Sequence, residues 1–462
     1  MRCLAARWTS VLGALVAVLS IAGPSPAATI DHVTQISLPN SVPVLGGDPA
    51  MRPSGFSERE YLVSGSANTY TAGPDGQAQI SAREVPYATR MLVRRPESEE
   101  DGAGGTVVLE LLDATAGWDA DQIWRYSREH LLREGITWVG LSVDPAALEA
   151  LRATRPERYG GVSMPTSGLA WDIVTQIAGT LRDRRSRENP LRFDRPKRLI
   201  VVGYGRAAEY LITYQNVFHW TTARRDGSPA IDGYLIAGAS GVARSVSSPA
   251  TDAVTGDGRL VVEHEVPVIR VQSETDLTEL DALTARQGDN AHFRLWEVAG
   301  AAHIDAVQRV RLDAVFGRDI PGYVPIVCTA PTGDVPLRYA LNAALGNLGR
   351  WNGRNLGPVA TRIRTTEGAS PRIVRDGDGN AMGGVRLPFI DVPTGRNAPK
   401  GEGPGDCRLA GTYTEFRRSE LRSRYPDRAD YVRKLRAAAA EAFQNRIMLR
   451  ADLHAMVREA RG

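Results

Sequence analysis

The chain has 462 residues, of which 24% are charged, and a formal net charge of +3. A nearly neutral chain has no electrostatic footprint for nucleic acid or for an anionic membrane surface, so we expect neither partner. The length allows one large domain or two ordinary ones. The histidines other than His303 form no pair at the spacing of metal ligands, so we expect no metal site, and no cofactor is implied.

The first 27 residues have the features of an export signal. Arg2 and Arg7 lie in a short basic region, Val11 to Ala22 is apolar, and Ser25 and Ala27 are small residues suited to a cleavage site. The apolar run is too short to span a bilayer as a stable helix. We therefore expect cleavage near Ala27 and a mature protein that is secreted or resides in the periplasm or cell envelope. The alternative is a buried N-terminal helix.

The middle of the chain alternates between strand-like and helix-like patterns. Strand patterns occur at 61–63, 87–93, 107–112, 138–143, 198–202, 231–237, 266–271 and 293–298. Helical spacing occurs between several of them, at 120–134, 171–181 and 207–217. Continuous apolar strands joined through helices are typical of a mostly parallel sheet covered on both faces. The sequence therefore predicts an α/β domain over residues 28–314.

The character of the chain changes after residue 314. Helical patterns at 337–351 and 428–447 flank a stretch rich in Gly and Pro, 352–406. We predict that residues 315–462 form an extension, helical and irregular, that packs on the same domain.

Two of the three cysteines, Cys328 and Cys407, remain after the predicted cleavage, and they bracket the irregular stretch. In an oxidising compartment two cysteines usually pair. We predict a disulfide that holds the irregular stretch against the domain. Two buried thiols are the alternative.

The strongest local signal runs from Leu199 to Leu211, where an apolar strand enters a tight turn and then a helix. Small residues stand at Gly203, Gly205 and Ala207. This is the pattern of a nucleophile elbow, G-x-S-x-G, whose turn exposes one reactive side chain above the sheet edge. Gly205 occupies the position of that side chain, so the serine nucleophile is missing.

The same glycines formally fit a dinucleotide fingerprint, G-x-G-x-x-G/A, through Gly203, Gly205 and Ala208. That fingerprint normally opens the first strand–helix unit of a domain, whereas this turn follows earlier strands and helices. The stretch where a ribose-binding acid is expected, 221–226, is loop-like. The elbow interpretation is favoured, and a tight turn without chemistry is a further alternative.

Two acids and a histidine follow the elbow. Glu274 and Asp276 stand just after a predicted strand, and His303 follows the next one. Elbow, acid and histidine, in this order, form the catalytic triad of α/β-hydrolases. A serine mechanism needs a base beside the hydroxyl and an acid that fixes the imidazole. We predict His303 as the base and Asp276 as the acid, with Glu274 as the competing acid.

At this point the chain resembles the bacterial exported alpha/beta hydrolase domain proteins, whose elbow typically reads G-x-S-Q-S-G. The resemblance covers nearly the whole mature chain. It is carried by blocks such as EREYLVSGSANTY at 58–70, VVLELLDATAG at 107–117, VPVIRVQSETDL at 266–277 and RLWEVAGAAHID at 294–305. It implies an α/β-hydrolase fold and an ester-type substrate. It also implies oxyanion donors at the backbone amides of Asp113 or Ala114 and of Arg206.

The chain departs from this family at the elbow, where Gly205 and the next three residues replace Ser-Gln-Ser-Gly. Three outcomes are open. The protein is a pseudohydrolase that binds a small ester-like ligand, or a weak hydrolase in which Asp276 and His303 activate water, or it uses another nucleophile such as Ser240.

Overall fold

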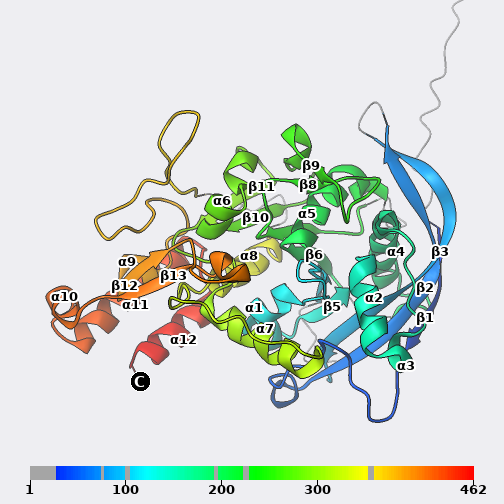
Figure 1. The fold of residues 1–462 in the computed structure, drawn as a ribbon, viewed down its shortest axis with the longest axis horizontal. Coiled ribbons are helices and arrows are strands. Elements are labelled where there is room, and N and C mark those ends of the chain that lie inside the picture. Colours follow the sequence, from blue (N-terminus) through cyan, green and yellow to red (C-terminus); the bar gives the residue numbers. More distant parts are fainter. Residues whose placement is uncertain are drawn as a thin grey trace, which may run out of the picture.

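The computed structural model describes residues 28–73, 77–98, 105–191, 196–221, 228–351, 358–359 and 361–461. The predicted export signal, residues 1–27, lies outside these ranges. At the centre is a nine-stranded sheet with the order β1-β2-β3-β5-β4-β6-β7-β10-β11 (Figure 1). Its strands are β1 (Ile30–Gln35), β2 (Phe56–Ala72), β3 (Ala78–Pro96), β4 (Thr106–Leu111), β5 (Thr137–Leu141), β6 (Arg198–Tyr204), β7 (Gly233–Ala237), β10 (Val268–Ser273) and β11 (Phe293–Val298).

The sheet has an antiparallel part and a parallel part. Strands β1, β2 and β3 form an antiparallel meander, and β3 pairs antiparallel with β5. From β5 to β11 neighbouring strands are parallel. The sequence predicted only the apolar centres of β2 and β3, because their ends are rich in Ser, Thr and other polar residues. Those ends pair with each other and extend the two strands far beyond the predicted segments.

Helices cover both faces of the sheet, which confirms the predicted fold class. One face packs against α2 (Pro145–Thr154), α4 (Ala170–Arg182) and α5 (Arg206–Thr213), and the other against α1 (Gln122–Arg133) and α8 (Arg338–Leu348). Successive residues of a strand point to opposite faces. In β6, Leu199 and Val201 enter the first core, whereas Ile200 and Val202 enter the second. This double burial explains why the strand is apolar throughout.

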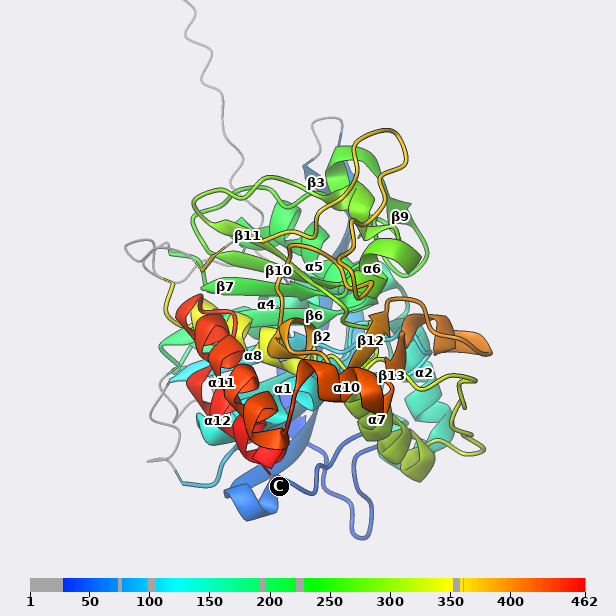
Figure 2. The ribbon, with the colours of Figure 1, turned by 90° about the vertical axis from the view of Figure 1, so that its left-hand side faces the viewer.

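The C-terminal residues share the second core. Helices α11 (Arg428–Gln444) and α12 (Arg450–Arg461) lie beside α1 and α8 (Figure 2). The boundary predicted between residues 314 and 315 falls inside a continuous helix, α7 (Ala306–Asp319). The Gly- and Pro-rich stretch docks on the sheet edge, where Thr361 and Val385 form bridges to β11. The backbone groups of the edge strand β11 are thereby partly paired.

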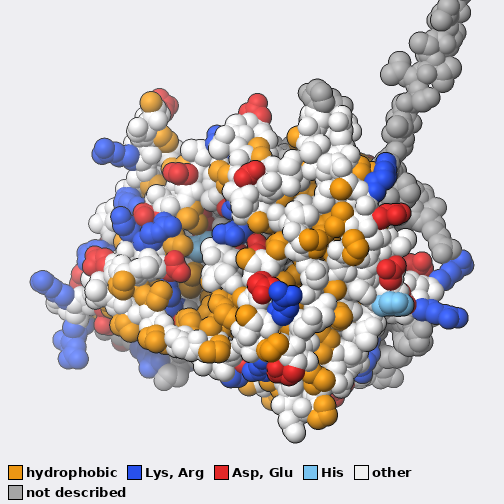
Figure 3. Space-filling view, turned by 45° about the vertical axis from the view of Figure 1, so that its right-hand side comes forward, with side chains coloured by type: hydrophobic (Ala, Val, Ile, Leu, Met, Phe, Trp, Pro, Cys, Tyr) orange, Lys and Arg blue, Asp and Glu red, His pale blue; other side chains and the backbone are white. Residues whose placement is uncertain are grey.

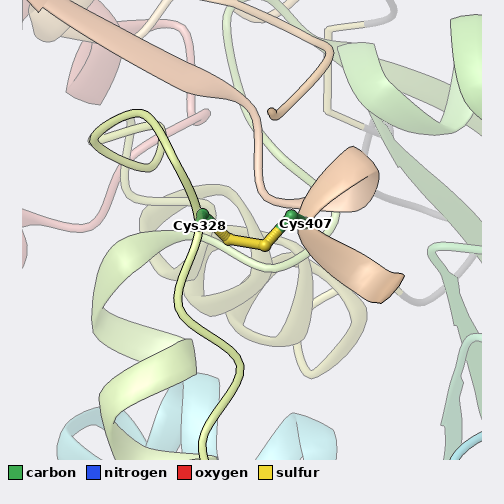
Figure 4. The surroundings of a disulfide bond; sticks show 2 residues. All are labelled: Cys328 and Cys407. Atoms are coloured by element: carbon green, nitrogen blue, oxygen red, sulfur yellow. A yellow bond between two sulfur atoms is a disulfide. The ribbon is translucent and has the colours of Figure 1, made fainter. Parts of the chain in front are cut away.

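Cys328 and Cys407 form a disulfide, as the sequence predicts (Figure 4). The bond links the segment after α7 to a short 3₁₀ helix, Gly405–Leu409.

Within the described residues no helix is long and apolar enough to cross a membrane. On the face shown in Figure 3, hydrophobic side chains gather over the centre and lower part, and acidic and basic side chains are scattered around them.

Candidate active site

The predicted elbow is a sharp turn between β6 and α5. Gly205 has φ 57° and ψ −126°, a conformation that glycine adopts without the steric penalty of a Cβ atom. Gly203 is also required, because a Cβ atom there would lie 2.8 Å from the backbone carbon and oxygen of Ala207. Helix α5 therefore starts hard against β6, and the space above Gly205 holds no side chain of the elbow itself.

Asp276 lies in the first turn of α6 (Glu274–Glu279) and is held by a capping box. Its backbone N–H donates to the Ser273 hydroxyl at 3.1 Å, and its Oδ2 accepts the Ser273 N–H at 2.6 Å. The remaining oxygen, Oδ1, lies 2.6 Å from Nδ1 of His303. Both side chains are buried, so the capping box fixes the carboxylate that in turn fixes the imidazole.

The competing acid, Glu274, faces other partners. One of its oxygens accepts the Gly300 N–H at 2.7 Å, and the other lies 2.7 Å from a guanidinium nitrogen of Arg375 in the C-terminal extension. Of the two predicted acids, the structure thus brings Asp276 to His303 and uses Glu274 to attach the extension.

Two tyrosines and a glycine position His303. Its carbonyl oxygen accepts hydrogen bonds from the hydroxyls of Tyr126, at 2.8 Å, and of Tyr204. The imidazole packs on the Tyr204 ring, with 4.9 Å between the ring centroids. A Cβ atom on Gly238, just after β7, would lie 3.1 Å from His303 Cε1 and 2.8 Å from Tyr204 Cζ, so both rings depend on a glycine there.

The role predicted for the Asp113 amide needs correction. Its N–H donates to the carbonyl of Ala120 at 2.9 Å and is therefore not free to bind an oxyanion. The bridge between these residues closes the loop after β4, and this pairing was not visible in the sequence. The amide of Ala114 stays a predicted donor. Besides Thr115 Oγ1, 3.4 Å away, the Arg206 N–H already has a nearer acceptor.

That acceptor is the side chain of Asp113, which the sequence did not identify as functional. Its Oδ1 accepts the Arg206 N–H at 3.2 Å, the Thr115 hydroxyl at 2.6 Å and the Thr115 N–H at 3.3 Å. A Cβ atom on Gly205 would lie 3.1 Å from Oδ1 and 3.2 Å from Oδ2. A buried carboxylate therefore lies against the position where a serine side chain would begin.

Three acids around His303 raise its pKa. Burial lowers the pKa of His303, but the carboxylates of Asp276 and then of Asp113 and Asp406 outweigh it and raise the pKa above 6.5. Burial raises the pKa of Asp113, against the opposing effects of its Thr115 hydrogen bond and of His303. Each of these groups thus favours the charged form of the other.

The raised pKa has a testable consequence. A general base must be neutral, so hydrolysis that depends on His303 should rise with pH through a midpoint above 6.5. Asp113→Asn removes one carboxylate and should move this pKa downward. NMR titration of the His303 imidazole in the wild type and in the variant measures both. An unchanged pKa in the variant would show that Asp113 does not act on His303.

The hydroxyl of Ser240, the alternative nucleophile, is committed elsewhere. It donates to Glu209 Oε1 at 2.5 Å, and Glu209 also pairs with Arg244 at 2.5 Å.

Among the described residues no group of three or more His, Cys, Asp or Glu side chains is arranged to hold a metal ion.

Comparison with known proteins assigns the chain to a family. Solved structures that resemble it include an esterase from Pyrococcus furiosus, 12% identical over 60% of this chain and 95% of its own, with a TM-score of 0.30. Another is an alpha-beta serine hydrolase homologue from Coxiella burnetii, 9% identical over 55% of this chain and 96% of its own, with a TM-score of 0.28. No curated protein matches. The family described as alpha/beta hydrolase domain matches residues 21–458. Since this match covers almost the entire length, the chain belongs to the alpha/beta hydrolase domain family.

Proposed function

We propose that this protein is a hydrolase of small ester-like molecules that works without a serine nucleophile, and that Asp276 and His303 activate the attacking water. The contact of 2.6 Å between Asp276 Oδ1 and His303 Nδ1 carries this proposal. A pair held by a capping box and two tyrosine hydroxyls is more than a turn without chemistry requires.

The proton arrangement suits a general base. With Nδ1–H donated to Asp276, the neutral imidazole presents a lone pair at Nε2. Transfer of a proton from water to a positioned imidazole contributes about 10²–10⁴-fold to a hydrolysis rate. Asp276 then stabilises the imidazolium that forms, as the acid of a triad does.

A binding module without turnover is the second candidate. It is favoured by the hydrogen bond from the Arg206 N–H to Asp113, because that amide would otherwise stabilise a developing oxyanion. The dinucleotide interpretation is disfavoured because a buried carboxylate stands at the N-terminus of α5, where a pyrophosphate would bind.

Export remains a proposal based on residues 1–27, and N-terminal sequencing of the mature protein would test it.

His303→Ala distinguishes the first two candidates. The wild-type protein should hydrolyse p-nitrophenyl acetate slowly, and the variant should lose about 10²-fold of that rate or more. His454→Ala is the matched control, since His454 is exposed on α12. The measurement is the release of p-nitrophenol above buffer. A wild-type rate that His303→Ala leaves unchanged contradicts water activation by His303 and supports the binding module.

A further inference from the structure

The carboxylate of Asp113 lies against the position where a side chain of residue 205 would begin. Asp113 is 4% exposed. Its carboxylate accepts the backbone N–H of Arg206, which lies 93 positions further along the chain. The loop that follows, Thr115 to Gly117, is exposed. The proposed function does not use this carboxylate, although its charge acts on His303.

The two oxygens of Asp113 differ in their surroundings. Oδ1 accepts three hydrogen bonds, from the Arg206 N–H and from the N–H and hydroxyl of Thr115. Within the described residues Oδ2 accepts none, and it lies 3.2 Å from the Cβ position of residue 205. Both oxygens lie close to the Cβ position of residue 205, Oδ1 at 3.1 Å and Oδ2 at 3.2 Å, but only Oδ2 has lone pairs that these hydrogen bonds leave unused.

We propose that Asp113 is the nucleophile of this protein and that its substrate carries a leaving group on a saturated carbon. This inference rests on the proposed function, because it uses the water that His303 activates. Oδ2 forms a bond to the saturated carbon while the carbon–leaving-group bond breaks. A halide departs as an anion with the bonding electrons. An epoxide oxygen keeps the electrons of its broken bond and takes a proton from solvent.

The second step regenerates the carboxylate. His303 removes a proton from water, and the hydroxide adds to Cγ of the Asp113 ester. The negative charge that develops on Oδ1 is stabilised by the Arg206 and Thr115 donors that already bind this atom. The bond between Cγ and the alkoxy oxygen then breaks, and the protonated His303 returns its proton to the leaving alcohol. The proton left on the Asp113 carboxyl group is released to solvent, which regenerates the carboxylate. The net reaction adds one water to an epoxide, whereas for a halide it replaces the halogen by a hydroxyl group and releases a halide ion and a proton.

The same hydrogen bonds should keep the hydrolysis of an ordinary ester slow. An ester carbonyl needs the Arg206 N–H for its own oxyanion, and this N–H is bound to Asp113 Oδ1. Attack at a saturated carbon makes no oxyanion on the substrate in its first step. The arrangement therefore favours a saturated electrophile over an ester.

Isotope labelling tests the covalent step directly. Excess wild-type enzyme is mixed with styrene oxide or with 1-bromohexane in H₂¹⁸O for a single turnover. We expect unlabelled oxygen in the product and ¹⁸O in the peptide that contains Asp113, read by mass spectrometry. The two probes distinguish an epoxide from a halide substrate. Label in the product alone, or turnover of neither probe, would overturn the assignment.

Variants separate this inference from the proposed function. Asp113→Asn keeps the shape of the side chain and an acceptor for the Arg206 N–H, and it should abolish turnover of both probes. Asp113→Ala should abolish it too, and neither variant should form the alkyl ester. His303→Ala should lose ester hydrolysis and accumulate the alkyl ester on Asp113. If His303→Ala loses ester hydrolysis but accumulates no alkyl ester, the nucleophile role fails while the proposed function stands. Turnover of either probe by a folded Asp113→Asn or Asp113→Ala, checked by circular dichroism, would contradict the nucleophile role.

Discussion

The double variant Gly205→Ser, Asp113→Ala is expected to hydrolyse p-nitrophenyl acetate about 10²–10³-fold faster than the wild type. The serine hydroxyl would face the Asp276–His303 pair, whose two members are already in contact at 2.6 Å. Removal of the carboxylate would leave the Arg206 N–H with only its long contact of 3.4 Å to Thr115 Oγ1, which an oxyanion could displace. A fluorophosphonate probe should label the new serine. Rapid-mixing assays with excess ester should show a burst of p-nitrophenol as the acyl-enzyme forms.

The single variant Gly205→Ser should gain much less. Its Cβ atom would lie 3.1 Å from Asp113 Oδ1 and 3.2 Å from Oδ2, tighter than ordinary contact. A side chain at φ 57° is also strained, although elbows with serine tolerate this strain. Gly205→Ala, Asp113→Ala is the matched control without a hydroxyl. Failure of the folded serine double variant to label would show that position 205 is not an elbow.

Asp276→Asn, made in the Gly205→Ser, Asp113→Ala background, should lower kcat by up to about 10⁴-fold, the scale of this change in a serine protease triad. The Asn amide would donate to Nδ1 of His303. The imidazole proton would then move to Nε2, which could no longer accept the serine proton. The geometry would persist because the remaining amide oxygen can accept the Ser273 N–H.

Glu274→Gln is the control for this prediction. Glu274 contacts Gly300 and Arg375 rather than His303, so kcat should stay within a few-fold. Its effect should fall on the melting temperature, because an uncompensated Arg375 would remain beside a buried site. Ester hydrolysis and thermal unfolding of both variants measure the two effects. Equal losses of kcat in Asp276→Asn and Glu274→Gln would contradict the assignment of the acid.

Local patterns in the sequence were sufficient for the parallel half of the fold. Strand β6 is apolar throughout because both of its faces are buried. The turn at Gly203 and Gly205 is encoded by residues that are neighbours in the chain, so it could be recognised without a structure. The order of elbow, acid and histidine likewise led to the prediction of Asp276 and His303, whose side chains the structure brings to 2.6 Å.

Long-range contacts decided the rest. Glu274 and Asp276 stand two positions apart, and only the capping box and the position of Arg375 separate their partners. The lengths of β2 and β3 and the docking of residues 361–385 on β11 depend on pairing between backbone groups, which polar sequences do not reveal. Such pairings become visible only when the chain is folded.

Asp113 shows the same limit at the site itself. In the sequence, Asp113 follows β4, and its backbone amide or that of Ala114 is a predicted oxyanion donor. The neighbouring residues do not indicate whether the backbone or the side chain of Asp113 faces the elbow. The parallel pairing of β4 with β6 brings its carboxylate to Gly205 and Arg206. The sequence by itself predicted an elbow that carries glycine at position 205. The tertiary structure determined that a carboxylate lies against that position, because the order of the strands sets which loops meet at the sheet edge.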